Sequence, residues 1–362
     1  MDISKLNIKK SILHISPYKP GESNEKAVKL SANENPLGCS LKVKESLANF
    51  SAFNLYPDGD ATMLKAKINE MFPQFSSENI VCGSGSDEII GLLISAFTKE
   101  GDEVISTEHG FLMYSIYAKS FGAVSIKAKE FDLSADIKNI LAKVTAKTRI
   151  IFIANPNNPT GTYLTKTALE ELRSKLRDDI LLVIDGAYAE YISDISDYES
   201  GIDLAYKYDN VIATRTFSKI HGLASLRVGY GIMAKELADI LNRIRGPFNL
   251  NQIAQEMAII ALDDKDFVKE SIRHNEEQMR LLKTELTKLN IKHYKSYANF
   301  ILIELNSEER ADKLTTYLKD SNIYIRQVKA YNLPTKVRVS IGTKIENQLF
   351  INKLKQFLTE YD

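Results

Sequence analysis

The sequence predicts an α/β fold, with a large domain whose mostly parallel sheet is flanked by helices and a smaller α+β domain. Between about residues 79 and 232, short apolar runs alternate with helical patterns, which is typical of parallel sheets covered by helices. After GPFN at 246–249 the pattern changes to a long amphipathic helix followed by shorter elements. We therefore expect an N-terminal arm at 1–40 that completes the smaller domain, a large domain at 41–246 and a small domain at 247–362.

Five short apolar runs in the first region are predicted to be buried strands, because polar or turn-forming residues bound each of them. They are NIVCGSG from residue 79, DEVIST from 102, RIIFIAN from 149, ILLVIDG from 180 and NVIATRT from 210. Helices are predicted at 86–97 and at 165–177, where Leu169, Leu172 and Leu176 share one face.

The second region is predicted to begin with a long helix. Apolar residues at helical spacing mark it: Val268, Ile272, Met279, Leu282, Leu286 and Leu289. Strand patterns follow in ANFILIEL (298–305), IYIR (323–326) and VRVSI (337–341), with helices at 308–319 and from about 346.

Composition argues against several functional classes. The 362-residue chain has 47 basic and 47 acidic residues, so it presents no general electrostatic field for nucleic acid or an anionic membrane. Its two cysteines, Cys39 and Cys82, provide no disulfide framework, and the five scattered histidines form no HxxxH or HExxH pair, so no metal site is predicted. Because neither an apolar leader nor an 18-residue apolar run occurs, we expect a cytoplasmic protein.

Polar residues follow the predicted strands, at the edge where sheets of this type bind ligands. GSGSDE at 83–88 opens a helix whose free N–H groups would suit a phosphate, although a plain helix-starting turn explains it equally well. A dinucleotide fingerprint would need a third glycine where Glu88 stands, which disfavours a nicotinamide dehydrogenase. NPNNPTG at 155–161 is a rigid turn that presents side-chain amides, and a purely structural turn is the commoner explanation.

A carboxylate and a lysine follow the last two strands. Asp185 ends a strand that should be buried, where it would serve as a helix cap or as the partner of a cationic ligand atom. Lys219 lies in TFSKIHGLASLRVGY at 216–230; a solvated lysine near a turn is the simpler explanation of this stretch alone, but buried lysines form Schiff bases. A phosphate cradle, an amide, a carboxylate and a lysine at one sheet edge together meet the needs of pyridoxal phosphate. A Ser-x-x-Lys hydrolase is disfavoured, because no SDN or KTG element occurs.

Ordered motifs along nearly the whole chain carry a resemblance to a known family. They are PYKPG at 17–21, LSANENPLG at 30–38, YPDG at 56–59, GSGSDE, NPNNPTG, DGAYAEY at 185–191, TFSKIHGLASLRVGY and VRVSIGT at 337–343. With them the chain resembles fold-type I pyridoxal-phosphate aminotransferases, and most closely the histidinol-phosphate aminotransferase family. The resemblance implies conversion of histidinol phosphate and 2-oxoglutarate to imidazole-acetol phosphate and glutamate, with pyridoxal 5'-phosphate held by the large domain.

The resemblance also implies roles for individual residues. Lys219 resembles the catalytic Schiff-base lysine, and Asp185 would bond the ring nitrogen of the cofactor. The other implied cofactor contacts are Tyr188 and Asn158 on the ring hydroxyl, Phe111 stacked on the ring, and Ser86, Asp87, Thr216, Ser218 and Arg227 on the phosphate. Tyr56 would reach the phosphate of the neighbouring subunit, which implies a homodimer with shared active sites.

Substrate contacts are expected from the small domain and the arm. Arg326 in IYIR and Arg338 in VRVSI alternate with apolar residues, so both could face a cleft, although a solvated strand face is the simpler explanation. By resemblance, Arg338 would bind the carboxylate of glutamate and Arg326 the phosphate of a phosphorylated amine. Tyr18 and Asn33 of the arm would close the site.

Two departures from the family and several alternative functions stay open. The family usually has an acidic or small residue at Gly186 and a proline where His109 stands. Neither change removes a catalytic group, but the position of His109 close before the stacking aromatic suggests an effect on substrate preference. The alternatives are another phosphorylated ketone such as dihydroxyacetone phosphate in surface-sugar assembly, decarboxylation of a phosphorylated amino acid, aromatic amino acids as substrates, and a non-catalytic regulator. Lys219 together with Asp185 argues against the last.

Overall fold

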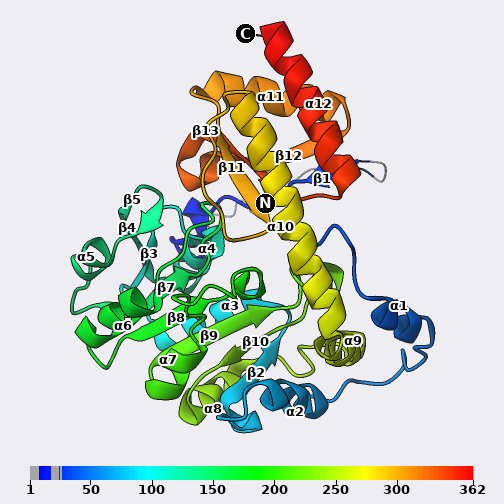
Figure 1. Ribbon diagram of the computed structural model, residues 1–362. Helices are drawn as coiled ribbons and strands as arrows, with labels where there is room; N and C mark the ends of the chain where they lie inside the picture. Colours follow the sequence, from blue (N-terminus) through cyan, green and yellow to red (C-terminus); the bar gives the residue numbers. More distant parts are fainter. Residues whose placement is uncertain (1–7, 18–23, 25–26, 362) are drawn as a thin grey trace.

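The computed structural model describes residues 8–17, 24 and 27–361 (Figure 1). Its larger sheet has seven strands and lies below a four-stranded sheet in that view. In sheet order the larger one consists of β2 (Ile80–Gly83), β10 (Gly229–Ile232), β9 (Val211–Thr216), β8 (Leu181–Asp185), β7 (Thr148–Ala154), β3 (Glu103–Thr107) and β4 (Val124–Ala128). β10 runs opposite to the other six strands of this sheet, which confirms the predicted α/β class with a mostly parallel sheet.

Helices cover both faces of the larger sheet, because successive strand residues point to opposite faces. Ile150 and Phe152 of β7 pack against one set of helices, whereas Ile151 and Ile153 pack against the other. The first set is α3 (Ser86–Phe97), α4 (Leu112–Phe121) and α8 (Lys235–Ile244). The second set includes α2 (Thr62–Met71), α5 (Ile137–Leu141), α6 (Lys166–Lys175) and α7 (Ile202–Lys207).

The five predicted strands of this region correspond to β2, β3, β7, β8 and β9, and α3 has the predicted bounds. Of the seven strands of the larger sheet, the sequence pattern misses β4 and β10. In β10, Gly229 and Gly231 conceal the strand, since glycine normally weakens strands. The structure requires glycine here, because a Cβ on Gly229 would lie 2.3 Å from the backbone nitrogen of Ser86 at the start of α3.

The smaller sheet includes a strand from the N-terminal arm. Its order is β1 (Val28–Leu30), β12 (Ile323–Val328), β13 (Leu333–Ser340) and β11 (Phe300–Glu304). β1 pairs in parallel with β12, with Val28 opposite Ile323. The covering helices are α10 (Lys265–Lys288), α11 (Glu308–Asp320) and α12 (Lys344–Tyr361). Across residues 8–17, 24 and 27–361, no helix combines the length and apolar character needed to cross a bilayer.

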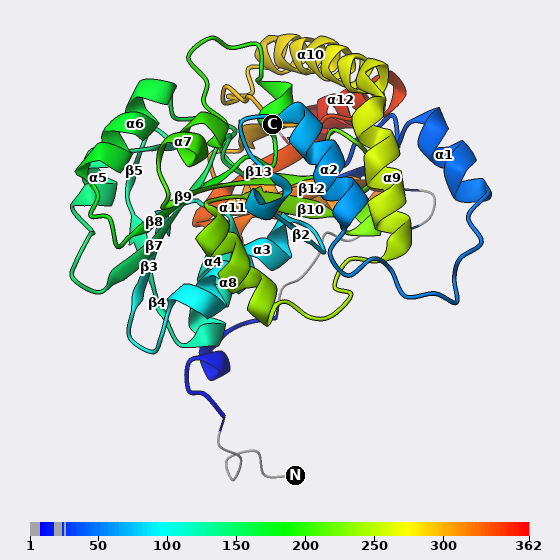
Figure 2. The same cartoon turned by 90° about the horizontal axis from the view of Figure 1, so that it is seen from below.

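Helix α9 (Gln252–Asp263) follows the predicted division at residue 246 and packs with the larger sheet. It lies beside α1 (Leu41–Ala48) and α2 near the end of the sheet that carries β2 and β10 (Figure 2). Its buried residues Ala254, Met257 and Ala258 share a core with the strands of that sheet. The division into an arm, a large domain and a small domain stays a prediction. The packing of α9 favours placing this helix in the large domain.

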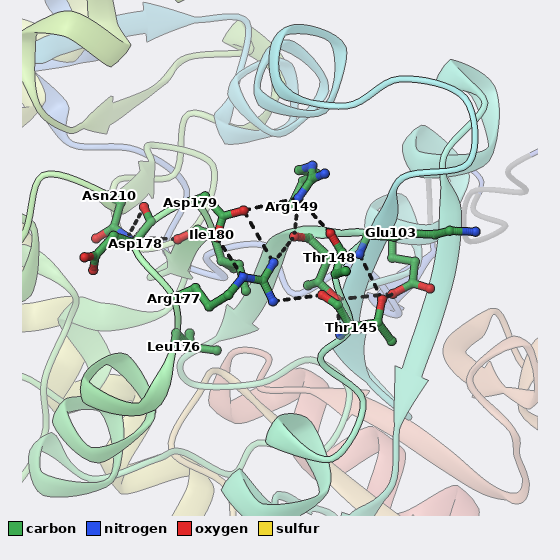
Figure 3. A network of polar contacts seen from close by, with 12 residues as sticks. Glu103, Thr145, Thr148, Arg149, Leu176, Arg177, Asp178, Asp179, Ile180 and Asn210 are labelled. Carbon is green, nitrogen blue, oxygen red and sulfur yellow. Dashed lines mark hydrogen bonds and ion pairs between the residues drawn. The ribbon is translucent and has the colours of Figure 1, made fainter.

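Ion pairs and hydrogen bonds between turns close the N-terminal edge of the larger sheet (Figure 3). Arg177 donates from Nε to Asp179 Oδ1 (2.8 Å) and from Nη1 to the carbonyl oxygen of Thr145 (2.9 Å). Arg149 lies 3.3 Å from Asp179 and 3.4 Å from Asp102. These charged groups therefore stabilise one another and the turns, whereas the polar groups predicted to bind a cofactor lie at the opposite edge of the sheet.

Candidate active site

A cavity of about 340 Å³ opens at the C-terminal edge of the larger sheet. The tips of the strands and the start of α3 supply its walls, as expected for a parallel sheet. It is lined by Ser86, Asp87, Phe111, Met113, Ala154, Pro156, Asn158, Asp185, Ala187, Tyr188, Thr216, Ser218, Lys219 and Arg227. The structure thus brings together every predicted cofactor residue except Tyr56.

Lys219 projects into this cavity from the turn after β9. Its Nζ donates a hydrogen bond to the carbonyl oxygen of Ala32 in the arm (3.1 Å) and lies 5.9 Å from the centroid of the Tyr188 ring. Burial, with the nearby positive charge of Arg338, lowers the pKa of Lys219 to about 8. The neutral amine is therefore well populated near pH 8, and a neutral amine is the form that attacks a carbonyl.

Asp185 ends β8 and is only 4% exposed. Its Oδ2 accepts a hydrogen bond from the Tyr114 hydroxyl (2.7 Å), and its Oδ1 accepts one from the Thr214 hydroxyl (3.1 Å). Burial raises the pKa of Asp185, while these two hydrogen bonds and the charge of Arg215 oppose the increase. A cation in the cavity would compensate the buried carboxylate, which is the property expected of a partner for a protonated ring nitrogen.

An anion-binding corner lies at the start of α3. Arg227, in the left-handed region with a φ of 53°, donates from Nη1 to the Ser218 hydroxyl (3.2 Å). Gly85 permits this approach, because its φ is +85° and an added Cβ would lie 2.6 Å from Nη2 of Arg227. Together the guanidinium, the hydroxyl and the free N–H groups of the first helical turn can hold a phosphate.

The smaller sheet and the arm close the other side of the cavity. Arg338 is 5% exposed and donates to Asn158 Oδ1 and to the Ser31 carbonyl oxygen, the latter at 2.7 Å. Asn33, with a φ of 56°, donates from Nδ2 to the Tyr188 hydroxyl (2.9 Å). In each of the two contacts with Asn158 and Tyr188, a predicted substrate residue therefore bonds to a predicted cofactor residue.

The two predicted substrate arginines lie on one face of the smaller sheet. Arg326 and Arg338 are direct partners in the antiparallel pairing of β12 with β13, so their side chains leave the sheet on the same side. The alternative of a solvated strand face is wrong for Arg338, which is buried against Asn158 and lies 5.3 Å from the centre of the Phe300 ring. Arg326 is half-buried.

Two predicted residues are not brought to this cavity. Tyr56 is 82% exposed and stacks on Phe248, with ring centres 4.6 Å apart. Tyr18 lies outside the described residues. The structure of one chain therefore neither assembles Tyr56 with the other cofactor residues nor tests the role expected of Tyr18.

Comparison with known proteins adds the decisive observation. The family model described as aminotransferase class I and II matches residues 25–354. The chain belongs to this aminotransferase family. Aminotransferases of the family depend on pyridoxal phosphate, which agrees with the predicted cofactor.

Relatives of this aminotransferase resemble it over nearly their full length. The histidinol-phosphate aminotransferase of Maricaulis maris is 45% identical, over 96% of this chain and 97% of its own. The Pelagibacter ubique protein of the same name is also 45% identical, over 94% and 96%. A solved histidinol-phosphate aminotransferase from Clostridium acetobutylicum is 26% identical with a TM-score of 0.83, covering 92% of this chain and 99% of its own. One from Sinorhizobium meliloti, solved with pyridoxal-5'-phosphate, shares the fold with a TM-score of 0.90 at 23% identity, covering 99% of both chains.

The residues of this aminotransferase fit its family's cofactor. The buried carboxylate of Asp185, the amine of Lys219 and the corner beside Gly85 supply the anion, the amine and the phosphate cradle that pyridoxal phosphate needs. Phe111 lines the same cavity and offers an aromatic face for the ring.

Three residues that support Asp185 were not predicted from the sequence of this aminotransferase. Tyr114 and Thr214 hold the carboxylate directly, whereas Arg215 acts on it through its charge while donating to the carbonyl oxygens of Thr214 and Ser200. A Cβ on Gly186 would lie only 2.1 Å from Nη1 of Arg215, so the guanidinium occupies the space that a larger side chain would take. The departure noted at Gly186 therefore has a structural reason. Thr214 could have been found, since it pairs with Asp185 across neighbouring strands, but Tyr114 enters from α4 and only the packing reveals it.

Proposed function

We propose that this aminotransferase transfers an amino group from histidinol phosphate to 2-oxoglutarate, giving imidazole-acetol phosphate and glutamate. The observation that carries the substrate class is the pair of arginines, Arg326 and Arg338, opposite one another on the side of the smaller sheet that meets the cavity. Guanidinium groups are the preferred binders of carboxylate and phosphate, and these substrates carry one or the other. The names of the relatives at 45% identity support the same choice.

Lys219 is the proposed proton carrier of the reaction. When bound, pyridoxal phosphate accepts the amino group and delocalises the electron pair left on the substrate carbon. Lys219 Nζ would take the proton from that carbon as general base and then, as general acid, deliver it to the cofactor carbon that holds the amino nitrogen rather than back to the substrate carbon. A pKa of about 8 suits both roles near neutral pH. Asp185 would keep the ring nitrogen protonated from the floor of the cavity.

The remaining cavity residues are proposed to bind and orient. Ser86 and Asp87 would donate backbone N–H groups to the phosphate, assisted by Thr216, Ser218 and Arg227. Phe111 would cover one ring face. Tyr188 and Asn158 would hold the ring hydroxyl, and the contact from Arg338 to Asn158 Oδ1 leaves the amide N–H groups of Asn158 as donors. Asn33 would close the site through its bond to Tyr188.

The arginines provide the test of the substrate. Arg326→Ala should slow the half-reaction with histidinol phosphate far more than that with glutamate, because losing one desolvated charged contact costs roughly 2–5 kcal/mol. Arg338→Ala should slow the glutamate half-reaction most. Single-turnover absorbance of the cofactor measures each half-reaction separately. Lys313→Ala on α11, which removes a cation paired with Glu309, is the matched control and should change neither.

The outcomes of this test are distinct. Equal slowing of both half-reactions by Arg326→Ala would remove its phosphate-specific role. A wild-type enzyme that prefers dihydroxyacetone phosphate, or phenylalanine and tyrosine, to histidinol phosphate and its ketone would replace the proposed substrate. In that case the assignment of the reaction as transamination would remain, and only the substrate would change.

A homodimer with shared sites is the second part of the proposal. Tyr56 and Phe248 form an exposed aromatic stack, and Phe53, Leu55 and Met63, which are close to Tyr56 in the sequence, are exposed as well. Exposed apolar side chains gathered in this way are typical of an interface. In a two-fold dimer, Tyr56 would enter the partner's cavity and bind the cofactor phosphate there.

Mixed dimers test the shared site. Tyr56→Ala and Lys219→Ala subunits should each be inactive. After random exchange in equal amounts, the mixture should regain about a quarter of the wild-type sites, because half of the dimers are mixed and each then has one intact site. Activity that stays absent although mixed dimers are isolated would contradict a shared site.

A further inference from the structure

His109 lies in the connection between β3 and α4, two residues before Phe111. Its backbone N–H donates to Glu130 Oε1 (3.1 Å), so the residue is held to the hairpin of β5 (Glu130–Phe131) and β6 (Ser134–Ala135). Its ring does not line the cofactor cavity. Instead, Nδ1 lies 2.6 Å from the carbonyl oxygen of Tyr331, which ends the short turn before β13.

We propose that His109 is a positioning residue that fixes the smaller sheet, and with it Arg338, relative to the Phe111 wall of the cofactor cavity. The contact connects a loop of the larger sheet directly to the backbone of the smaller one, and His109 is only 8% exposed. This inference rests on the roles proposed above for Phe111 and Arg338.

The partner of the ring determines its protonation pattern. A carbonyl oxygen can only accept a hydrogen bond, so Nδ1 of His109 must carry a proton. The donating nitrogen is attached to Cγ, the first ring atom beyond Cβ. An asparagine at this position would present its Nδ2 N–H from the same point along the side chain, whereas a glutamine would present its N–H one atom further out.

Apolar packing beside this hydrogen bond makes the connection rigid. Leu112 of α4 and Leu133 pack against a buried cluster of the smaller sheet formed by Leu302, Val328, Tyr331 and Leu333. Leu112 directly follows Phe111, and Leu333 begins the strand that carries Arg338. A shift at His109 would therefore change the spacing between the ring wall and the substrate arginine at the same time.

Replacing His109 by Ala, Asn and Gln tests the proposal, because only Asn keeps an N–H donor at the position of Nδ1. His109→Ala should raise KM for glutamate and for the phosphorylated amine about tenfold, a change of about 1.4 kcal/mol, while kcat at saturation changes less than about twofold. His109→Asn should restore KM to within about twofold of the wild type, and His109→Gln should resemble His109→Ala. In ¹⁵N-histidine-labelled protein, with or without cofactor, the His109 signal should show a protonated Nδ1.

A second histidine provides the matched control. His274 Nε2 lies 3.0 Å from the carbonyl oxygen of Gly342, a similar ring-to-backbone bond that does not involve the Phe111 loop. His274→Ala should lower thermal stability without changing KM.

Three results would overturn the positioning role: equal KM values for the Asn and Gln variants, an unchanged KM in a folded His109→Ala protein, or a proton on Nε2 alone. A different natural substrate would change which compounds react, but it would not remove the contrast between Asn and Gln. The failure of the substrate proposal is thereby distinguishable from the failure of this one. If His109→Ala does not fold, the comparison of KM between His109→Asn and His109→Gln still tests the positioning role.

Discussion

Lys219→Ala should abolish the reducible covalent link to pyridoxal phosphate and slow transamination by on the order of 10⁴-fold or more, since it removes both the attacking amine and the proton carrier. The wild-type holoenzyme should be yellow. Borohydride reduction followed by peptide mapping should label Lys219. Because burial lowers the pKa of Lys219 to about 8, covalent capture of added pyridoxal phosphate by the apoprotein should accelerate with pH through about 8.

Lys127 offers a matched control for this variant. Like Lys219 it is half-buried, burial lowers its pKa to about 8, and it lies on β4 bonded to the Ser106 hydroxyl, outside the cofactor cavity. Lys127→Met should keep the colour, the labelled peptide and most of the turnover. A label on Lys127, or on no lysine at all, would contradict the assignment of Lys219.

Asp185→Asn is expected to keep the cofactor bound but to lower kcat by about 10²–10⁴-fold, because a neutral amide no longer holds the ring nitrogen protonated. A charge-assisted hydrogen bond to a buried cation is worth a few kcal/mol, and each 1.36 kcal/mol is tenfold in rate. Cofactor content from absorbance and kcat from steady-state rates separate the two effects. Tyr114→Phe and Thr214→Val, which each remove one hydrogen bond to the carboxylate, should cause smaller losses.

Glu190 is the control for the charge of Asp185. It is a second buried carboxyl whose pKa burial raises, it lies five residues further along, and it does not line the cavity. Glu190→Gln should change kcat by less than about tenfold. Turnover near the wild-type value in Asp185→Asn would mean that this carboxylate serves only the local structure.

Sequence reasoning located the strand tips but not the groups that support them. Ser86, Asn158, Asp185 and Lys219 could be found because each ends a short apolar run or follows one within a few residues, and such runs have a clear pattern. Tyr114 could not be found, because it lies on α4 and the helical pattern there predicts only that the residue is buried. Its hydrogen bond to Asp185 is seen only in the folded structure. The reason for a glycine at position 186 could not be predicted either, because it depends on the position of the Arg215 side chain.

Two strands of the larger sheet were missed by the sequence pattern for different physical reasons. β4 is an edge strand with partly exposed residues, and β10 contains two glycines, so neither resembles a buried apolar run. The roles of Tyr56 and of the dimer could be inferred only from resemblance, because a contact between two chains leaves no periodic signal in one of them. They stay predictions.

The pairing of β1 with β12 has a consequence for the order in which the protein is assembled during translation. Every strand of the larger sheet has been synthesised once Ile232 is added, so that sheet can fold while the chain is still growing. Val28, in contrast, must wait for Ile323 to emerge before the two can pair. The arm that carries Asn33 is among the first segments made, yet it reaches its place among the last. The proposed substrate side of the site can therefore be completed only near the end of synthesis, after every residue that this chain contributes to its own cofactor cavity has been made.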